Sequence, residues 1–142
     1  MLAVDTHSMD HPSRAILIVE DHGPTTAVMA RLVRARGFTV ITAGSVTEAR
    51  RIAREHNIGF VITDLGLADG DGWGLMAELH EERGVKGAAV SGFGMTADVE
   101  RSREVGFIMH LVKPISVHQL ESLLDVARLE LDGSSPPFPG LH

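Results

Sequence analysis

The sequence has no cysteine, and its charged residues give no basic excess. Without cysteine the chain can form neither a disulfide nor a reactive or metal-bound thiolate, which is compatible with a reducing compartment. The formal net charge is -6, whereas non-specific binding to nucleic acid requires a basic surface. These deficits exclude a disulfide-stabilised scaffold and thiol chemistry, and they argue against direct binding to DNA.

Long hydrophobic segments are also missing. The apolar runs are far shorter than the roughly 20 residues that span a bilayer. The N-terminal stretch has neither the basic start nor the continuous apolar core of a signal peptide. We therefore expect a soluble, cytoplasmic protein without membrane insertion. At 142 residues, with 44% hydrophobic and 23% charged residues, the chain suits one domain with a real core.

The pattern that is present is an alternation of apolar strands and amphipathic helices. The predicted strands are 15–19, 38–42, 60–62, 88–90 and 107–112. The predicted helices begin near residues 23 and 72 and cover 46–56, 96–105 and 117–131. Such alternation predicts an α/β fold, with five βα units in a doubly wound parallel sheet between two helical layers. We assign residues 14–131 to this domain and residues 1–13 and 132–142 to flexible tails, since both ends lack apolar periodicity.

The first candidate for chemistry is Asp64, which follows the apolar run 60–62 and precedes a turn rich in Gly and Asp. A carboxylate at the end of a buried strand is costly unless something binds it. In open α/β sheets, ligands bind at the carboxyl edge of the strands. The same edge should gather the polar residues that follow the other strands, which are Glu20, Asp21, Ser91 and Lys113.

This set of residues has the chemistry of a phosphoryl-transfer site. Three carboxylates repel one another unless a cation lies among them, and oxygen ligands with room for water suit Mg²⁺. Ser91 and Lys113 add a hydroxyl and an ammonium group. These groups would neutralise the oxygens of a phosphoryl group while Asp64 attacks in line and becomes an acyl phosphate.

The segments ILIVED, VITDLGLADGDGW, AVSGFG and HLVKP, in this order and spacing, resemble the receiver domain of two-component response regulators. The resemblance covers residues 14–131 and implies a flavodoxin-like three-layer sandwich with strand order 2-1-3-4-5. It implies that a histidine kinase or a histidine phosphotransfer protein phosphorylates Asp64. Ser91 would be the switch hydroxyl that moves to the phosphoryl group, and Lys113 would pair with that group.

The resemblance also implies the metal ligands and the output surface. Mg²⁺ would bind Asp21, Asp64 and the backbone carbonyl of Gly66, with Glu20 in the outer shell. A downstream protein partner would read the surface formed by the predicted fourth helix, fifth strand and fifth helix, about residues 96–129. The chain would act through these contacts and would not be an enzyme beyond promoting its own phosphorylation and dephosphorylation.

Three positions depart from the usual receiver pattern. Glu20 replaces a frequent Asp, and Ala68 stands where many receivers have proline, which should loosen the loop after Asp64. His110 occupies the position of an aromatic switch residue. Because histidine titrates near neutrality, we hypothesise that His110 makes the output surface pH-sensitive; the alternative is a passive side chain that fills the aromatic slot.

Three other functions stay open at this point. The chain could be a receiver from a hybrid histidine kinase or a longer regulator. It could be a small aspartyl-phosphate hydrolase, although such enzymes usually carry an acid where this sequence has Gly66. It could also be a receiver-like binding module that never takes phosphate.

Other motifs have simpler interpretations. Asp69 and Asp71 hint at a calcium loop, but the acid spacing and the closing Glu are absent, so we interpret them as turn residues. Ser45 and Glu48 have the spacing of a capping box for helix 46–56. Residues 92–97 resemble a dinucleotide fingerprint, but they follow the fourth strand and no ribose-binding acid is in place.

Overall fold

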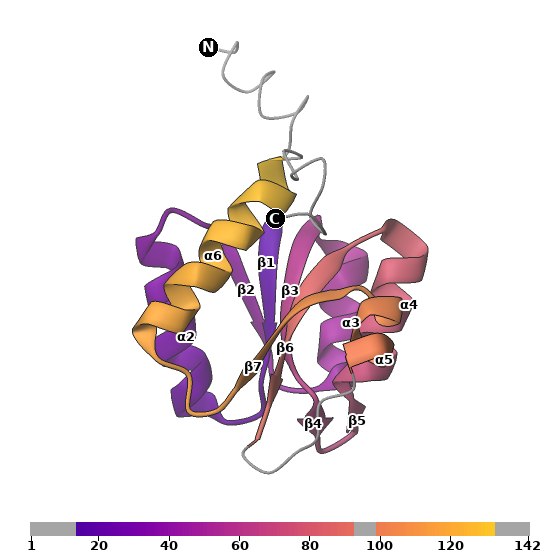
Figure 1. The fold of residues 1–142 in the computed structure, drawn as a ribbon. Helices are drawn as coiled ribbons and strands as arrows, with labels where there is room; N and C mark the ends of the chain where they lie inside the picture. The colour runs from indigo at the N-terminus through magenta and orange to yellow at the C-terminus, as the bar shows by residue number, and fades with distance from the viewer. Residues whose placement is uncertain (1–13, 93–98, 133–142) are drawn as a thin grey trace.

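The computed structural model describes residues 14–92 and 99–132, and all structural statements below refer to them (Figure 1). The predicted tails, apart from Asp132, and most of the fingerprint-like segment lie outside the described residues. The central strands are β1 (Ala15–Val19), β2 (Val40–Ala43), β3 (Ile58–Asp64), β6 (Lys86–Ser91) and β7 (Phe107–Val112). All four neighbouring pairs are parallel, and the order is β2-β1-β3-β6-β7.

Helices cover both faces of this sheet (Figure 1). They are α2 (Gly23–Ala35), α3 (Val46–Glu55), α4 (Gly72–Arg83), α5 (Val99–Val105) and α6 (Val117–Asp132). Helices α2 and α6 lie on one face, and α3, α4 and α5 lie on the other (Figure 1). The additional strands β4 (Gly66–Leu67) and β5 (Gly70–Asp71) form a separate hairpin, so β6 and β7 are the fourth and fifth strands of the main sheet. The predicted flavodoxin-like order 2-1-3-4-5 is therefore confirmed.

Strands β1 and β3 are buried along their whole length, as continuous apolar runs predict for a parallel sheet covered on both faces. Side chains alternate between the faces of a strand. In β1, Leu17 and Val19 therefore join the core under α3 and α4, whereas Ile16 and Ile18 join the core under α2 and α6. The sheet thus separates two apolar cores and delivers the last residue of each strand to one edge.

The opposite edge joins the first strand to the last helix. The Arg14 guanidinium donates hydrogen bonds to the carbonyl oxygens of Glu130, at 2.9 Å, and of Leu131, in the last turn of α6. Arginine is well suited to the free carbonyls at a helix C-terminus. A Cβ on Gly59 of β3 would lie 2.8 Å from the Cβ of Arg14, so glycine allows this close approach.

The structure differs from the sequence prediction at several places. The β4–β5 hairpin was not predicted, and β3 and β6 begin earlier than the apolar runs, at Ile58 and Lys86. Val28 has helical spacing with Leu32 and Val33, which favours a buried position, but it is 57% exposed. Val28 lines a groove between α2 and the start of α6, where no other described element covers it. The apolar spacing of the helix therefore extends beyond the buried core.

No described helix has the length and apolar character needed to cross a membrane.

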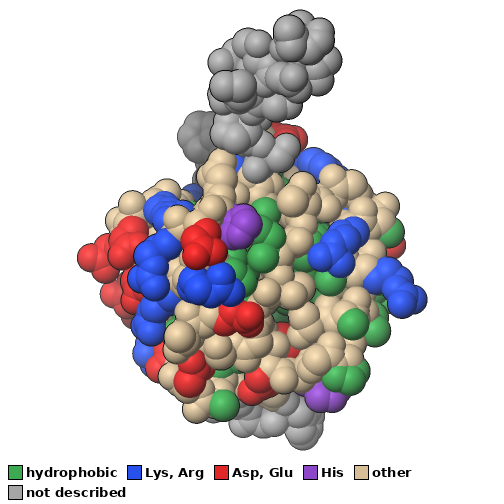
Figure 2. Space-filling model, turned by 180° about the vertical axis from the view of Figure 1, so that it is seen from behind, with side chains coloured by type: hydrophobic (Ala, Val, Ile, Leu, Met, Phe, Trp, Pro, Cys, Tyr) green, Lys and Arg blue, Asp and Glu red, His purple; other side chains and the backbone are tan. Residues whose placement is uncertain are grey.

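The surface carries charges of both signs. On the face seen from behind, acidic and basic side chains lie side by side (Figure 2). Ion pairs join such side chains on α3 and α4, including Arg50 with Glu78 and Arg51 with Glu55.

Candidate functional site

The carboxyl edge of the sheet brings the ends of four strands together. Backbone hydrogen bonds continue one residue past the strands, from Leu65 N–H to the Val90 carbonyl at 2.9 Å and from Lys113 N–H to the Ser91 carbonyl at 2.8 Å. Asp64 is aligned with Val90 in the β3–β6 register. The ladder therefore sets the positions of Asp64, Ser91 and Lys113 relative to one another.

Three carboxylates lie together at this edge. Each of Glu20, Asp21 and Asp64 offers an oxygen within 4.8 Å of the other two. Glu20 is 4% exposed and Asp64 is 8% exposed, whereas Asp21 is exposed. Two buried carboxylates next to a third acid require partners that offset desolvation and repulsion.

Lys113 is the cation that meets both buried acids. Its Nζ lies 2.6 Å from Glu20 Oε1 and 2.9 Å from Asp64 Oδ2. Partial burial lowers the pKa of Lys113, but hydrogen bonds from its ammonium to Glu20 and Asp64 outweigh this and raise the pKa overall. The lysine is therefore charged at neutral pH and bridges the two buried carboxylates.

The remaining oxygens of these acids accept backbone hydrogen bonds. Gly66 N–H donates to Asp64 Oδ1 at 3.1 Å, and His22 N–H donates to Glu20 Oε2 at 3.0 Å. Gly72 lies against the backbone of Asp64, where a Cβ would be 2.4 Å from the Asp64 carbonyl oxygen. Each buried carboxylate is thus held by one ammonium contact and one backbone N–H.

Ser91, the expected switch hydroxyl, lies next to His110, which occupies the position of the aromatic switch residue. Ser91 is 1% exposed, and its Oγ lies 2.9 Å from His110 Nε2. His110 Nδ1 is buried and has no hydrogen-bond partner among the described residues. Burial lowers the pKa of His110 from its ordinary value of 6.5. The neutral imidazole is therefore the favoured form of this side chain near pH 7.

The acid set suits a hard divalent cation. Carboxylate oxygens are the ligands that Mg²⁺ prefers, and this ion usually keeps several waters. Asp21 is exposed, and an open hollow of about 730 Å³ borders Glu20 and Asp21. The donor chemistry and the room for water both fit Mg²⁺.

The sequence did not reveal how the loop after Asp64 is attached. Asp69 Oδ1 accepts a hydrogen bond from Val46 N–H at 2.9 Å, and its Oδ2 accepts from Thr47 N–H at 3.0 Å and Thr47 Oγ at 2.9 Å. Asp71 caps α4 by accepting from Gly74 N–H at 2.7 Å. Both acids are more than turn residues, but only their type and the turn around them were visible in the sequence.

The predicted cap of α3 is confirmed in part. Ser45 Oγ accepts a hydrogen bond from Glu48 N–H at 3.1 Å, as a capping box requires. The Glu48 carboxylate instead accepts from Gly44 N–H at 2.6 Å, one residue before the expected donor. Two acids therefore accept backbone hydrogen bonds at the start of α3. Glu48 accepts from Gly44 within the same segment, and Asp69 accepts from Val46 and Thr47 from another part of the chain.

Known proteins with similar sequences are regulators. The family described as response regulator receiver domain matches residues 16–125. The photosynthetic apparatus regulatory protein RegA of Cereibacter sphaeroides is 30% identical over 127 residues, which cover 89% of this chain and 67% of RegA. The polar-differentiation response regulator DivK of Brucella ovis is 32% identical over 108 residues, which cover 74% of this chain and 88% of DivK.

A third relative is longer than the matched region. The transcriptional regulatory protein PdtaR of Mycobacterium tuberculosis is 30% identical over 115 residues, and the chain spans 56% of its length. The activities of such longer proteins therefore do not transfer directly to this chain.

Solved structures have the same fold. A CheY-like response regulator receiver domain from Methylobacillus flagellatus aligns with a TM-score of 0.70 and 30% identity, over 80% of this chain and 98% of that one. A CheY-like receiver domain protein from Methanospirillum hungatei aligns with a TM-score of 0.74 at 23% identity, over 85% and 95% of the two chains. The matched family, the strand order and the acidic edge of the sheet agree, and the chain belongs to the response regulator receiver domain family.

Proposed function

We propose that this chain is a phosphorylation-dependent switch, in which Asp64 accepts a phosphoryl group from a phosphohistidine donor. The observation that carries the proposal is the Lys113 ammonium held 2.9 Å from Asp64 Oδ2, beside two further carboxylates. A carboxylate that is buried, oriented and paired with a fixed cation is equipped to receive a phosphoryl group.

In the proposed reaction, a carboxylate oxygen of Asp64 attacks phosphorus while the bond to the donor imidazole nitrogen breaks. Asp21, Asp64 and the Gly66 backbone carbonyl would hold Mg²⁺, with Glu20 in its outer shell. When bound, Mg²⁺ supplies positive charge next to the phosphoryl oxygens. Lys113 neutralises a further part of that charge.

Ser91 is the proposed switch hydroxyl. Its Oγ would donate a hydrogen bond to a phosphoryl oxygen and shift a two-state equilibrium. The chain would promote only its own phosphorylation and dephosphorylation, and it would work in the cytoplasm.

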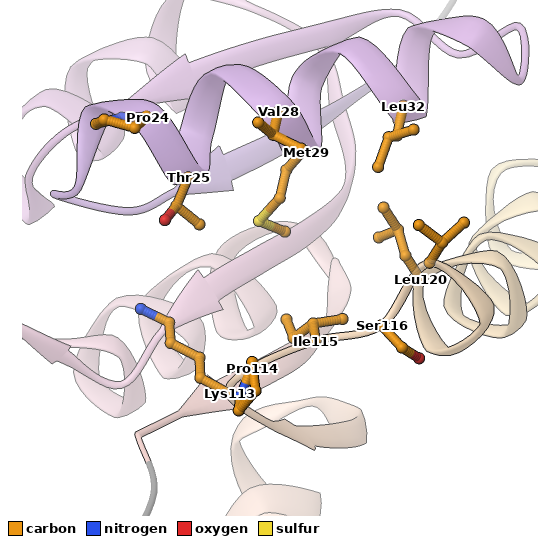
Figure 3. A pocket seen from close by; sticks show the side chains of 11 residues that line it. Pro24, Thr25, Val28, Met29, Leu32, Lys113, Pro114, Ile115, Ser116 and Leu120 are labelled. Carbon is orange, nitrogen blue, oxygen red and sulfur yellow. The ribbon is translucent and has the colours of Figure 1, made fainter.

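We assign the phosphohistidine donor to the groove beside Lys113. This groove has a volume of about 700 Å³ and lies between α2, the segment after Lys113 and the start of α6. Met29 and Leu32 of α2 point toward Ile115 and Leu120 across it (Figure 3). A donor protein must bring its phosphohistidine to Asp64, so it has to cover surface next to the site.

The apolar rim of the groove supports this assignment. Val28 is 57% exposed and Val117 is 55% exposed, and both line the groove. Exposed aliphatic residues around a concave surface are typical of protein contact sites. The occupant would be an apolar face of the donor, because apolar side chains of α2 and of the start of α6 line the groove.

The downstream partner is proposed on a different surface, formed by α5, β7 and α6. Ile108 and Val112 of β7 are 39% and 44% exposed, and His110 lies between them in the strand. Ser91 contacts His110, so a movement of Ser91 would reach this surface directly. The formal net charge of -6 suits protein contacts better than direct DNA binding.

Acetyl phosphate with Mg²⁺, followed by mass measurement of the intact protein, tests the proposal. We expect one phosphoryl adduct that is lost slowly, and none in Asp64→Ala or after chelation of Mg²⁺. Absence of an adduct in the parent protein would contradict the proposal and favour a binding module that never takes phosphate. Rapid turnover of acetyl phosphate would favour an aspartyl-phosphate hydrolase.

A further inference from the structure

The loop after Asp64 is tied to the start of helix α3. The Asp69 carboxylate accepts hydrogen bonds from the N–H groups of Val46 and Thr47, at 2.9 and 3.0 Å, and from the Thr47 hydroxyl at 2.9 Å. These three bonds link segments that are 22 and 23 residues apart in the sequence. They are the polar part of the contact.

Apolar packing reinforces the same contact. Leu67 and Val46 are both buried in the core cluster under α3 and α4. A Cβ on Gly70 would lie 3.2 Å from Val46 Cγ2, so the hairpin backbone lies directly against this side chain. The start of α3 therefore contacts the loop through a carboxylate, an aliphatic side chain and a close backbone approach.

The hairpin connects this contact to the phosphorylation site. Gly66 pairs with Asp71 and Leu67 pairs with Gly70 in the two-stranded β4–β5 ladder, which places Asp69 in the turn. Gly66 N–H donates to Asp64 Oδ1 at 3.1 Å. Only two ladder pairs separate Asp69 from Gly66, whose N–H binds the Asp64 carboxylate. A displacement of the turn at Asp69 would therefore also displace Gly66.

We propose that Asp69 is a positioning residue for the phosphorylation site, which fixes the backbone of Gly66 by tying the β4–β5 hairpin to the N-terminus of α3. The inference rests on the proposed function of Asp64 and concerns how its loop is held. Position 68 is alanine, so the loop does not have the fixed φ that a proline would provide. In this chain the Asp69 contact restricts the loop instead.

The electrostatics favour an ionised Asp69. Hydrogen bonds from the Val46 and Thr47 N–H groups and from the Thr47 hydroxyl lower the pKa of Asp69 below its ordinary value of 3.8. A negative charge near the first turn of a helix also interacts favourably with the helix dipole. The Asp69 carboxylate is therefore ionised at neutral pH.

A simpler explanation is that Asp69 only caps α3. Ser45 already serves as the N-cap, because its Oγ accepts from Glu48 N–H at 3.1 Å. Ser45 is the residue directly before α3, whereas Asp69 binds the start of α3 from the loop after Asp64. The two residues therefore form a matched pair: loss of either weakens the start of α3, but only loss of Asp69 releases the loop.

The experiment compares Asp69→Ala and Ser45→Ala in the full chain. Amide hydrogen exchange without Mg²⁺ reports loop order, through the hydrogen-bonded N–H groups of Leu65, Gly66 and Gly72. We expect faster exchange at these amides in Asp69→Ala and parent-like exchange in Ser45→Ala. Similar decreases in Tm in both variants would show that the loss at α3 is matched.

A second readout is Mg²⁺ affinity, followed by the fluorescence of the single tryptophan, Trp73, at the start of α4. We expect Kd to rise about tenfold in Asp69→Ala, the lower end of what supporting residues of metal sites contribute, and to stay within about twofold in Ser45→Ala. Parent-like exchange and affinity in Asp69→Ala, or equal losses in both variants, would overturn the role of Asp69. If the parent binds Mg²⁺ but forms no adduct, the proposed function fails while exchange still decides the role of Asp69.

Discussion

Ser91 Oγ and His110 Nε2 are joined by a hydrogen bond of 2.9 Å. The other ring nitrogen of His110 is buried without a partner among the described residues. A bare lone pair at Nδ1 is better tolerated there than an unpaired N–H, since buried orphan donors are especially rare. The proton of the neutral ring is therefore expected on Nε2, from which it is donated to Ser91. In that arrangement the Ser91 hydroxyl proton is free for a phosphoryl oxygen.

The first prediction concerns acid sensitivity at His110. Burial lowers the pKa of His110 in the folded state below 6.5, so the unfolded chain binds more protons in the interval between the two pKa values. Stability from this group is full above about pH 6.5 and is lost as the pH falls toward the folded pKa. The free energy of unfolding of the parent should drop more between about pH 7 and about pH 5 than that of His110→Phe.

Chemical denaturation at each pH measures this difference, and parallel curves for the two proteins would contradict it. The direction of the shift also bears on the hypothesis of a pH-sensitive output surface. Because titration is moved to the acidic side of 6.5, a change in partner affinity caused by His110 should occur at the acidic end of the interval between about pH 6 and about pH 8.

The second prediction separates the chemistry of Lys113 from cation binding. Lys113→Met removes the ammonium that contacts Glu20 and Asp64, so adduct formation should slow by about 100-fold or more. Mg²⁺ affinity should be retained or increased, because a cation that shares the same oxygens is gone. Lys86→Met, at the start of β6, is the control and should behave as the parent. Loss of Mg²⁺ binding in Lys113→Met would show that the lysine orders the acids instead of competing for them.

The third prediction concerns the close approach of Gly72 to the Asp64 backbone. The Cβ of Gly72→Ala would lie 2.4 Å from the Asp64 carbonyl oxygen, so the strand end or the helix start must shift. We expect a loss of about 1–3 kcal/mol in the free energy of unfolding, together with slower adduct formation.

Gly74→Ala is the matched control in the same helical turn. Its Cβ would meet Asp71 Oδ1 at 3.5 Å, which is an ordinary contact. Alanine is the better helix former by up to about 1 kcal/mol, so this variant should be as stable as the parent or more stable. Equal stability of the two variants by denaturation would refute the importance of the close approach.

The fourth prediction distinguishes donor docking from chemistry. Val28→Gln replaces an exposed aliphatic side chain of the groove by a polar one that suits a helix. Phosphotransfer from a phosphohistidine protein should slow severalfold, while phosphorylation by acetyl phosphate should not change. Leu129→Gln, on the part of α6 away from the groove, should leave both rates unchanged. An equal effect of the two substitutions on the donor reaction would remove the assignment of the groove.

The strand ends could be predicted from sequence because a parallel sheet places them on one edge whatever the details of packing. Glu20, Asp64, Ser91 and Lys113 were found in this way, and the sheet order is as expected. The attachment of Asp69 to Val46 could not be predicted, because it depends on how a loop packs against a helix 23 residues away. Val28 shows a further limit, since an apolar period on a helix does not say where the covered surface ends.

The contact between Arg14 and the last turn of α6 has a consequence for how the domain can be connected. It places the start of β1 and the end of α6 at one end of the sheet, whereas β3 ends at the other (Figure 1), and Asp64 is the last residue of β3. The two ends of the described domain therefore do not crowd the phosphorylation site or the groove beside Lys113, and either end can carry a connection without covering them at its point of attachment.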